Sequence, residues 1–226
     1  MKRPYVICHM MTSVDGRIDC AMTEHLPGVQ EYYDTLDELD APTRVSGKVT
    51  AELEMALPGK FHSESETPIG KEAFSKKRNA EGYEIVVDTC GTLLWEDSAE
   101  EERPLLILMS EKASREYLAY LDERYISWIV CGSERVDLKR ACEILAEEFG
   151  VERMAVVGGG HINAGFLAAD LLDEVSVLIG SGIDGRGGMA AVFDGLPKER
   201  PVTPLKLSLV KPYESGAVWL RYTVKN

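Results

Sequence analysis

Short apolar runs alternate with segments of helical period along most of this chain, and this alternation limits the folds open to it. The runs are rich in Val, Ile and Leu, as buried strands are. They predict strands at Tyr5–Thr12, Thr43–Ser46, Tyr83–Asp88, Leu105–Met109, Ile126–Cys131, Met154–Val157, Glu174–Ile179, Leu205–Lys211 and Val218–Val224. Repeated strand–helix–strand units predict an α/β fold, with a mostly parallel sheet and helices on both faces.

Helices are predicted between several of these strands. Apolar residues recur at helical spacing from Arg115 to Arg124 and from Asp137 to Phe149. Asp137 is a typical N-cap, and Gly150 follows the expected end of the second helix. A third helix is predicted from Ala164 to Leu172.

The C-terminal part of the chain departs from the parallel pattern. Only the short segment PYESGA separates the last two predicted strands, so we expect an antiparallel hairpin there. The stretch from Leu57 to Gly82 is polar and has no clear period, and it predicts a long loop, a lid or a dimer arm. We find no repeat and no linker, and predict one domain over residues 1–226.

Charge and composition exclude several classes of protein. Apolar residues make up 45% of the chain and charged residues 28%, which is typical of a globular protein. The formal net charge of −13 argues against a nucleic-acid-binding protein, which needs a basic face. The apolar runs are too short to cross a membrane. The basic and apolar start, MKRPYVICHMM, is not expected to be a signal peptide, because polar residues interrupt it and no cleavage site follows.

The five cysteines indicate a reducing compartment. Their number is odd, and Cys8, Cys90 and Cys131 lie in or at the end of apolar runs, as buried free thiols do. We therefore expect a cytoplasmic protein. No C-x-x-C pair occurs, so no metal site is expected.

The sequence VVGGGHIN, from Val156 to Asn163, places three glycines between a strand and a helix. Free amides and the positive end of the helix dipole favour phosphate at such a point, and glycines let a ligand approach the backbone. The dinucleotide fingerprint G-x-G-x-x-G fails, because Asn163 stands at the third glycine. A tight turn without any ligand is the alternative interpretation.

Three further segments follow predicted strands. Ile179–Gly188 is glycine-rich and predicts either a wall of the same cleft or a mobile loop. Met11–Asp19 contains an Asp-Gly turn signal. Arg44–Glu52 predicts a second strand-to-helix junction, where Lys48 and Thr50 could meet phosphate.

Taken together, these segments resemble the riboflavin-biosynthesis pyrimidine reductase family, over almost the whole chain. The matching motifs are S-x-D-G at Ser13–Gly16, G-x-x-T at Gly47–Thr50, V-V-D-T at Val86–Thr89, the glycine turn at Gly158–Gly165 and L-x-D-E at Leu171–Glu174. The segment GGGHINAGFLAADLLDEVSVLIG is the most specific part of the match. The resemblance implies a dihydrofolate-reductase-like fold, NADPH as cofactor, hydride transfer to a ribosylamino-pyrimidine phosphate of the 5-amino-6-(5-phosphoribosylamino)uracil type, and a homodimer.

The resemblance also assigns roles by position. Substrate would contact Ser13, Asp15 and Val157. An imine is reduced more easily when it is protonated, and our own hypothesis is that Asp15, directly or through water, or else Glu24 supplies the proton to the substrate nitrogen. Asp15 could instead only cap its turn. The residues implied to bind the cofactor are Met11, Gly47, Lys48, Thr50, Glu54, Thr89, Gly158, Gly159, Gly160, His161, Ile162 and Asn163.

The chain departs from the family pattern on the substrate side. Val157 and Cys90 replace a common Glu and Arg, the segment ALPGKF with Lys60 replaces D-P-x-L-T-x-R, and the early helix YDTLDELD is acidic. Two alternatives therefore stay open. One is a reductase of the same fold for another pyrimidine, a pterin or a small carbonyl compound. The other is a non-catalytic nucleotide-binding domain.

Overall fold

The computed structural model describes residues 2–65 and 67–225, and it has the α/β fold predicted from the sequence. Contacts within the chain define two compact units. Among the described residues, unit 1 contains residues 2–4 and 42–154, whereas unit 2 contains Tyr5–Ala41 and residues 155–225. The prediction of a single domain stays a prediction.

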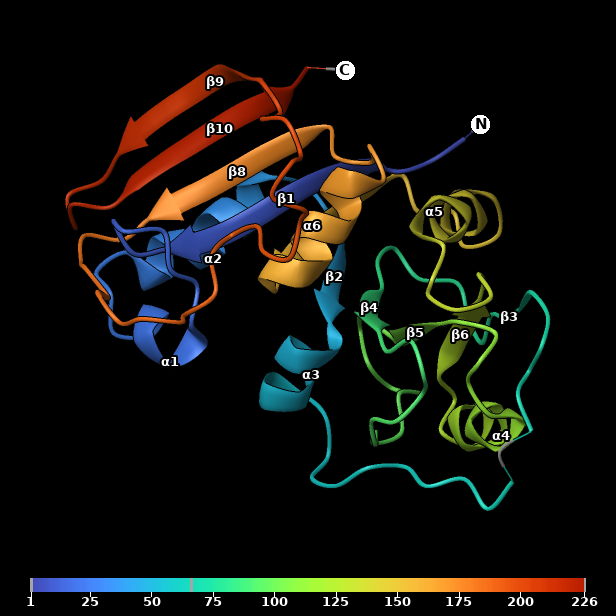
Figure 1. Ribbon diagram of the computed structural model, residues 1–226. Helices are drawn as coiled ribbons and strands as arrows, with labels where there is room; N and C mark the ends of the chain where they lie inside the picture. The colour runs from blue at the N-terminus through green and yellow to red at the C-terminus, as the bar shows by residue number, and fades with distance from the viewer. Residues whose placement is uncertain (1, 66, 226) are drawn as a thin grey trace. The chain divides into compact units, whose positions relative to one another are not determined.

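Unit 2 is built on a sheet that the two ends of the chain form together (Figure 1). Its strands follow the order β7 (Arg153–Gly158), β1 (Tyr5–Thr12), β8 (Glu174–Ile179), β10 (Val218–Val224) and β9 (Leu205–Pro212). Strand β1 is parallel to β8, and β10 is antiparallel to both β8 and β9. The predicted C-terminal antiparallel hairpin is therefore confirmed.

Helices cover both faces of the unit 2 sheet: α2 (Val29–Glu38) lies on one side and α6 (Gly160–Ala168) on the other (Figure 1). A short helix, α1 (Cys20–Thr23), precedes α2. On the α2 side, Ile7, Leu178 and Trp219 form a fully buried core. The acidic early helix YDTLDELD that the sequence analysis names, residues 33–40, lies largely within α2.

The bounds predicted for the third helix, Ala164–Leu172, are wrong. Helix α6 begins at Gly160, and it ends at Ala168 because Asp170 adopts a positive φ of 56° that a helix does not allow.

Unit 1 has the parallel strands β2 (Thr43–Gly47), β4 (Glu84–Val87), β5 (Leu105–Met109) and β6 (Ser127–Val130). Its helices are α3 (Lys48–Glu54), α4 (Arg115–Glu123) and α5 (Leu138–Glu147). The predicted N-cap is confirmed, because the Asp137 carboxylate accepts hydrogen bonds from the amides of Lys139 and Arg140. Tyr117 and Leu121 of α4 are fully buried in the main apolar cluster of this unit.

Most of the described part of segment 57–82 is a long loop, as predicted, but it also contains a strand and is held by hydrogen bonds. Ala73–Ser75 forms strand β3, antiparallel to β6. The Glu116 carboxylate of α4 accepts hydrogen bonds from Ser63 Oγ and from the amides of Glu64 and Ser65, at 2.7 to 2.9 Å. The polar sequence of this segment did not predict these contacts, because their partners, Glu116 and strand β6, lie about 50 residues further along the chain.

The cysteines are free thiols, as expected. Cys8, Cys131 and Cys142 are buried, but Cys90 is exposed, contrary to our prediction. Cys90 lies in a turn closed by the hydrogen bond from Gly91 N to Asp88 O, just beyond the end of β4, so it leaves the buried strand. Among the described residues, no helix is both long and apolar enough to span a membrane.

Candidate functional site

The glycine turn joins β7 to α6 and leaves the start of this helix without a side-chain cap. Gly158 has φ of 144°, which only glycine adopts readily, and its peptide bond to Gly159 is cis. Gly159 is the N-cap of α6, and in the part of the chain that the structure describes no side chain caps this end. By contrast, Ser114 and Asp137 cap α4 and α5. The first amides of α6 therefore keep their capacity to bind an anion.

The third glycine of the run has a structural role. A Cβ atom on Gly160 would lie 2.4 Å from the carbonyl oxygen of Ala191 and 3.2 Å from Cβ of Asp194. The carbonyl of Gly160 accepts a hydrogen bond of 3.1 Å from the amide of Asp194. Gly160 thus lets segment 191–194 pack directly on the start of α6.

Asn163 supports the same contact. Its side chain is fully buried, and its Nδ2 donates a hydrogen bond of 2.7 Å to the carbonyl of Val192. Its Oδ1 is buried and has no hydrogen-bond partner among the described residues. His161 is exposed and lies against Gly195, while the amide of Ile162 bonds to Gly159 O within the helix. Of the predicted cofactor residues at this turn, Gly160 and Asn163 therefore also have clear packing roles.

The Ser13–Gly16 turn follows β1 and is closed by its own hydrogen bonds. The amide of Gly16 donates to Ser13 O at 2.9 Å, and Gly16 has a positive φ of 79°. Ser13 is buried, and its Oγ donates to Asp15 Oδ1 at 2.7 Å and accepts from the amide of Arg17 at 3.1 Å. Ser13 and Asp15, which are both predicted substrate contacts, therefore bond to each other.

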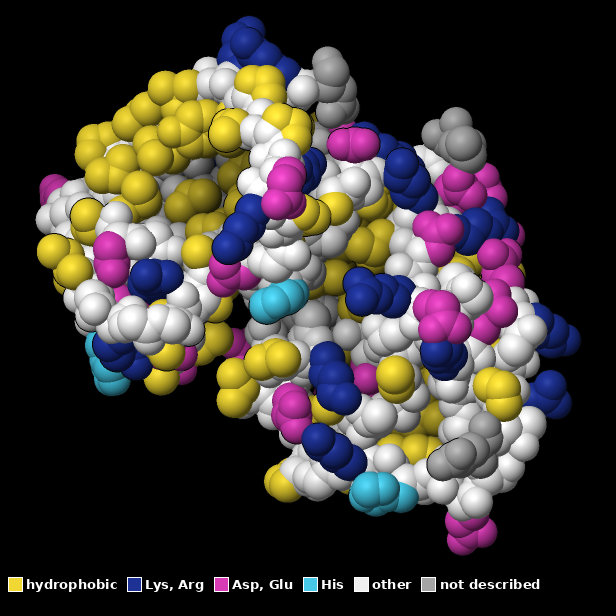
Figure 2. Space-filling view, viewed as in Figure 1, with side chains coloured by type: hydrophobic (Ala, Val, Ile, Leu, Met, Phe, Trp, Pro, Cys, Tyr) yellow, Lys and Arg dark blue, Asp and Glu magenta, His cyan; other side chains and the backbone are white. Residues whose placement is uncertain are grey.

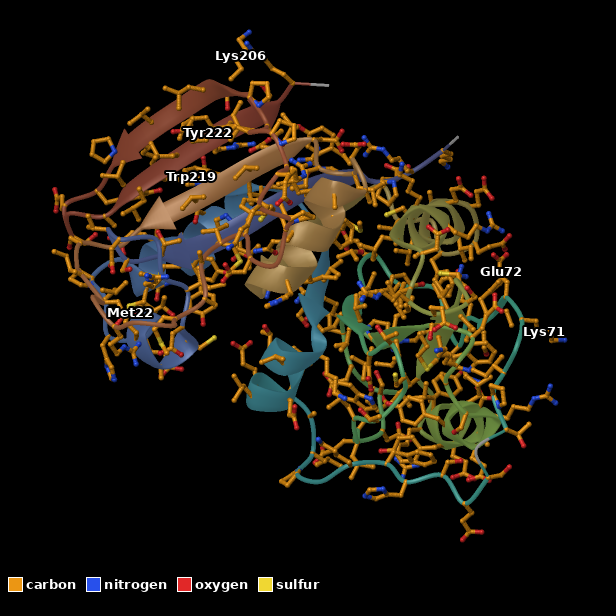
Figure 3. The ribbon with its side chains drawn as sticks, in the orientation of Figure 1. Met22, Lys71, Glu72, Lys206, Trp219 and Tyr222 are labelled. Atoms are coloured by element: carbon orange, nitrogen blue, oxygen red, sulfur yellow. The ribbon has the colours of Figure 1, made fainter. Side chains whose placement is uncertain are left out.

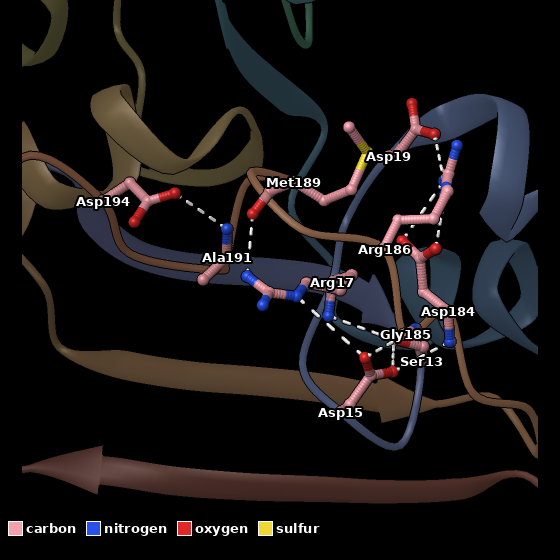
Figure 4. Close-up of polar contacts among 10 residues, drawn as sticks. All are labelled: Ser13, Asp15, Arg17, Asp19, Asp184, Gly185, Arg186, Met189, Ala191 and Asp194. Carbon is pink, nitrogen blue, oxygen red and sulfur yellow. Dashed lines mark hydrogen bonds and ion pairs between the residues drawn. The ribbon is translucent and has the colours of Figure 1, made fainter.

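Asp15 holds the glycine-rich loop after β8 (Figure 4). Its carboxylate accepts hydrogen bonds from the amides of Asp184 (2.9 Å) and Gly185 (3.0 Å). The Ser13 hydroxyl and these two amides hold the pKa of the Asp15 carboxyl far below its usual range. Asp15 is therefore ionised near neutral pH, which favours the turn-holding role over proton donation.

Two arginines complete this tie between the turn and the loop. Arg186 bonds to Asp184 and to Asp19 Oδ2, the latter at 2.6 Å, and Arg17 Nη1 donates to Met189 O at 2.8 Å (Figure 4). The hydrogen bond from Arg186 lowers the pKa of Asp184. Residues 184–189 are thus held by several contacts, which argues against the mobile-loop interpretation of this segment.

Gly47 and Lys48, two of the predicted cofactor residues of unit 1, form the start of α3. Gly47 is the N-cap of this helix, again without a side-chain cap among the described residues, and Lys48 is its first residue. Lys48 Nζ donates to Thr92 Oγ1 and lies 3.8 Å from Asp88 Oδ1. The buried Asp88 carboxylate also accepts from the amides of Thr92 (2.6 Å) and Leu93 (2.8 Å). Asp88 therefore orients Lys48, the lysine that is predicted to contact the cofactor.

The remaining predicted residues differ in exposure. Thr50 and Thr89 are half-buried, and the carbonyl of Thr89 accepts from Ser110. Glu54 is exposed at the end of α3, and Glu24 is exposed at the end of α1. In unit 2, Met11 is buried and paired with Leu178, and Val157 packs against the cluster of Leu36, Ala41 and Ala155. Val157 is thus at least partly a core residue.

The sequence analysis did not single out Arg17, Asp19, Asp184, Arg186 or Asp194 as functional residues. The available signal was a charged residue beside a glycine in both the turn after β1 and the loop after β8. The sequence did not pair these two segments, because they lie about 170 positions apart in the chain. Among residues 2–65 and 67–225, no group of three or more potential metal ligands comes together.

Comparison with known proteins identifies relatives over almost the full length. Residues 4–220 match the family model described as the RibD C-terminal domain. A 2,5-diamino-6-ribosylamino-4(3H)-pyrimidinone 5′-phosphate reductase of Methanothermobacter thermautotrophicus is 28% identical, and the match covers 99% of each chain. The protein of the same name from Archaeoglobus fulgidus is 25% identical over 85% of this chain and 87% of its own length.

Solved structures confirm the fold. A pyrimidine reductase-like protein from Corynebacterium diphtheriae superposes with a TM-score of 0.73 at 18% identity, covering 99% of this chain and 92% of its own. A riboflavin biosynthesis reductase from Saccharomyces cerevisiae superposes with a TM-score of 0.61 at 18% identity, covering 99% and 90%.

Proposed function

Because this chain belongs to the RibD C-terminal domain family, we propose that it is an oxidoreductase of riboflavin biosynthesis that reduces a phosphorylated ribosylamino-pyrimidine. The observation that carries the proposal is the start of α6, where a glycine N-cap leaves the first amides open to an anionic ligand. This turn lies at the carboxyl end of a strand, where ligands bind in open α/β sheets.

We propose 2,5-diamino-6-ribosylamino-4(3H)-pyrimidinone 5′-phosphate as the substrate. The names of the relatives from Methanothermobacter and Archaeoglobus support this compound over the aminouracil expected from the sequence. The two compounds differ only in the pyrimidine ring, so a direct comparison of both as substrates separates these assignments.

NADPH is the proposed cofactor. The turn at Gly158 and Gly159 fits a phosphate-bearing ligand, because it combines a helix N-terminus with backbone that carries no Cβ atoms. In unit 1, Lys48 is the proposed contact to the 2′-phosphate, and its ion pair with Asp88 orients the ammonium group. Met11, Thr50, Glu54 and Thr89 remain proposed contacts.

When bound, the cofactor would supply a hydride to the carbon of the C=N bond that forms when the substrate's sugar ring opens, and a proton would add to the nitrogen of that bond. The residues of this chain bind and orient the reactants. Since Asp15 is held as a carboxylate by Ser13 and two amides, we propose it as a positioning residue that fixes loop 184–186, rather than as the proton donor.

The first experiment measures binding of NADPH and NADH by calorimetry, followed by loss of nicotinamide absorbance when each ribosylamino-pyrimidine phosphate is added. Tighter binding of NADPH with oxidation by the diamino compound supports the proposal. Oxidation only with another pyrimidine, a pterin or a carbonyl compound would indicate a different substrate. Binding without oxidation by any of them would indicate a non-catalytic nucleotide-binding domain, and failure to bind either nucleotide would refute the cofactor assignment.

A cytoplasmic location and a homodimer are also part of the proposal. The free thiols of all five cysteines support the first. The homodimer is proposed from the family resemblance alone.

A further inference from the structure

A small pocket of unit 2 lies beside the start of strand β8. It has a volume of about 280 Å³ and adjoins Val175, the second residue of β8, and Leu205, the first residue of β9. Leu167 from the last turn of α6 forms part of its wall, and the rest comes from residues 193–203. The loop 184–189 instead comes after the end of β8. The pocket is therefore separate from the proposed cofactor turn, although both involve helix α6.

The walls of this pocket are mostly apolar. Eight of the ten residues that line it are apolar, and the other two are Arg200 and Thr203. Figure 2 shows hydrophobic side chains gathered over β9 and β10, and the pocket adjoins the start of β9. Val202, which lines the pocket, is 92% exposed. Molecules in solution therefore have access to an apolar hollow, which is the usual character of a ligand site.

Arg200 brings a positive charge into this apolar pocket, and in the described part of the chain no carboxylate pairs with it. Its Nη1 donates to Thr203 Oγ1 at 2.8 Å and to Pro201 O at 3.4 Å. Its Nη2 donates to Leu167 O at 3.2 Å. These acceptors are all neutral. The N–H of Nε and one N–H of Nη2 have no partner among the described residues.

The unpaired N–H groups of Arg200 suit a carboxylate. They belong to adjacent nitrogens of a planar guanidinium, which binds the two oxygens of a carboxylate in a fork. Arg200 is half-buried beside apolar side chains, where water screens its charge less than at an open surface. Lys206, labelled in Figure 3, does not share this role, because it pairs with Thr223 and projects from the face of β9 opposite to Leu205.

We propose that this pocket binds a small organic carboxylate with an aromatic body. The carboxylate accepts hydrogen bonds from Arg200, and the ring packs on apolar walls such as Phe193 and Leu196. An apolar cavity of about 150 Å³ holds benzene, so the volume of this pocket has room for about two fused rings. A free phosphate would leave the apolar walls unused. A rigid ring also loses less conformational freedom on binding than a flexible chain of the same volume.

The pocket shares one segment of the chain with the start of α6. Phe193 lines the pocket, while its neighbour Val192 accepts a hydrogen bond of 2.7 Å from Asn163 Nδ2. On the other side, the amide of Asp194 donates to Gly160 O at 3.1 Å. A ligand packed on Phe193 therefore restrains both peptide groups that hold the start of α6. An effect on NADPH affinity rests on the proposed function, whereas binding of the carboxylate does not.

The test is a titration with 1-naphthoate, followed by the backbone amide signals in NMR spectra without nucleotide or substrate. Signals of residues 193–203 should shift and saturate with a Kd of about 1 mM, which is typical for a compound of this size. 1-Naphthamide has the same shape without the charge, and it should bind about tenfold more weakly. Hydrogen exchange at the amide of Asp194 should slow when naphthoate is bound.

Two variants change the pocket and a third is the control. Arg200→Met should raise the Kd of naphthoate about tenfold, to that of naphthamide. Val202→Asp should also raise it about tenfold by repulsion, and its fold is safe because Val202 is almost fully exposed. Lys198→Met is the matched control, since Lys198 is an exposed cation of the same segment that does not line the pocket. It should keep the wild-type Kd.

Several results would overturn the proposal. One is the absence of shifts at residues 193–203 up to about 10 mM naphthoate, ten times the expected Kd. Others are equal affinities for naphthoate and naphthamide, or a folded Arg200→Met variant that binds naphthoate as the Lys198→Met control does. Circular dichroism checks the fold of each variant. A failure to oxidise NADPH would refute the proposed function and would leave these binding results unchanged.

Discussion

Replacing Gly160 by alanine tests the packing at the start of α6. The new Cβ would lie 2.4 Å from Ala191 O, whereas ordinary contact begins at 3.4 Å, so segment 191–194 or the helix must move by about 1 Å. Overpacking against a rigid neighbour costs up to about 3 kcal/mol. Alanine offsets up to about 1 kcal/mol of this by its higher helix propensity. The net loss is about 2 kcal/mol, which for a chain of this size lowers Tm by about 4–8 °C.

Scanning calorimetry of Gly160→Ala measures this change, with Gly187→Ala as the control. No atom lies within 4 Å of a Cβ built on Gly187, and its φ is outside the left-handed region, so this variant should keep the wild-type Tm. If NADPH binds at this turn, Gly160→Ala should also raise its Kd by about tenfold through displacement of the amides. Equal Tm values for the two variants would refute the close approach of segment 191–194.

Three further predictions concern Asp15, Lys48 and Tyr117. The pKa of Asp15 is lowered in the folded protein, so its stabilisation of loop 184–186 is fully present above the unfolded pKa and is lost as the pH falls through the folded value. Asp15→Asn should speed hydrogen exchange at the amides of this loop and leave the dependence of kcat on pH near neutrality unchanged. If the variant instead loses a titration of kcat near neutral pH, Asp15 is the acid. Lys48→Met should raise the Kd of NADPH about tenfold and leave that of NADH unchanged, whereas equal effects on both would refute the 2′-phosphate contact. Tyr117→Phe should lower the free energy of unfolding, measured by urea denaturation, by about 1–3 kcal/mol, because the hydroxyl of the fully buried Tyr117 donates to Leu93 O at 2.7 Å and accepts from Trp95 Nε1 at 3.0 Å. An unchanged urea midpoint would contradict this.

Strand positions could be predicted where burial dominates. The bounds of β1, β5 and β8 agree with the apolar runs, because most of their residues are buried. Strand β10 was also placed correctly, from its apolar residues and the short turn before it, although most of its residues are only half-buried. The Asp137 cap of α5 was also readable, since capping depends on neighbouring residues alone. Strand β3 was missed, because its three residues are specified by pairing with β6 and have no pattern of their own.

The positions of the candidate site residues could be predicted from the sequence, but several of their contacts and roles could not. The glycines and the Ser13–Gly16 turn could be located from the sequence, but the contact of Gly160 with Ala191 could not. Likewise, Asp15 meets its two amide partners 169 and 170 residues further along the chain. Such contacts depend on the sheet topology, and no local pattern records them.

The division of unit 2 between both ends of the chain has a consequence for synthesis on the ribosome. Ile7 of β1 pairs with Glu174 of β8, which is translated 167 residues later. At a rate of about 5–20 residues per second, the ribosome completes this partner roughly 8–33 s after β1. Residues 42–154 of unit 1 are complete earlier and can fold during this interval. We therefore expect the buried strand of Tyr5–Thr12 to be the main chaperone-binding segment of the nascent chain, and unit 1 to reach protease resistance first.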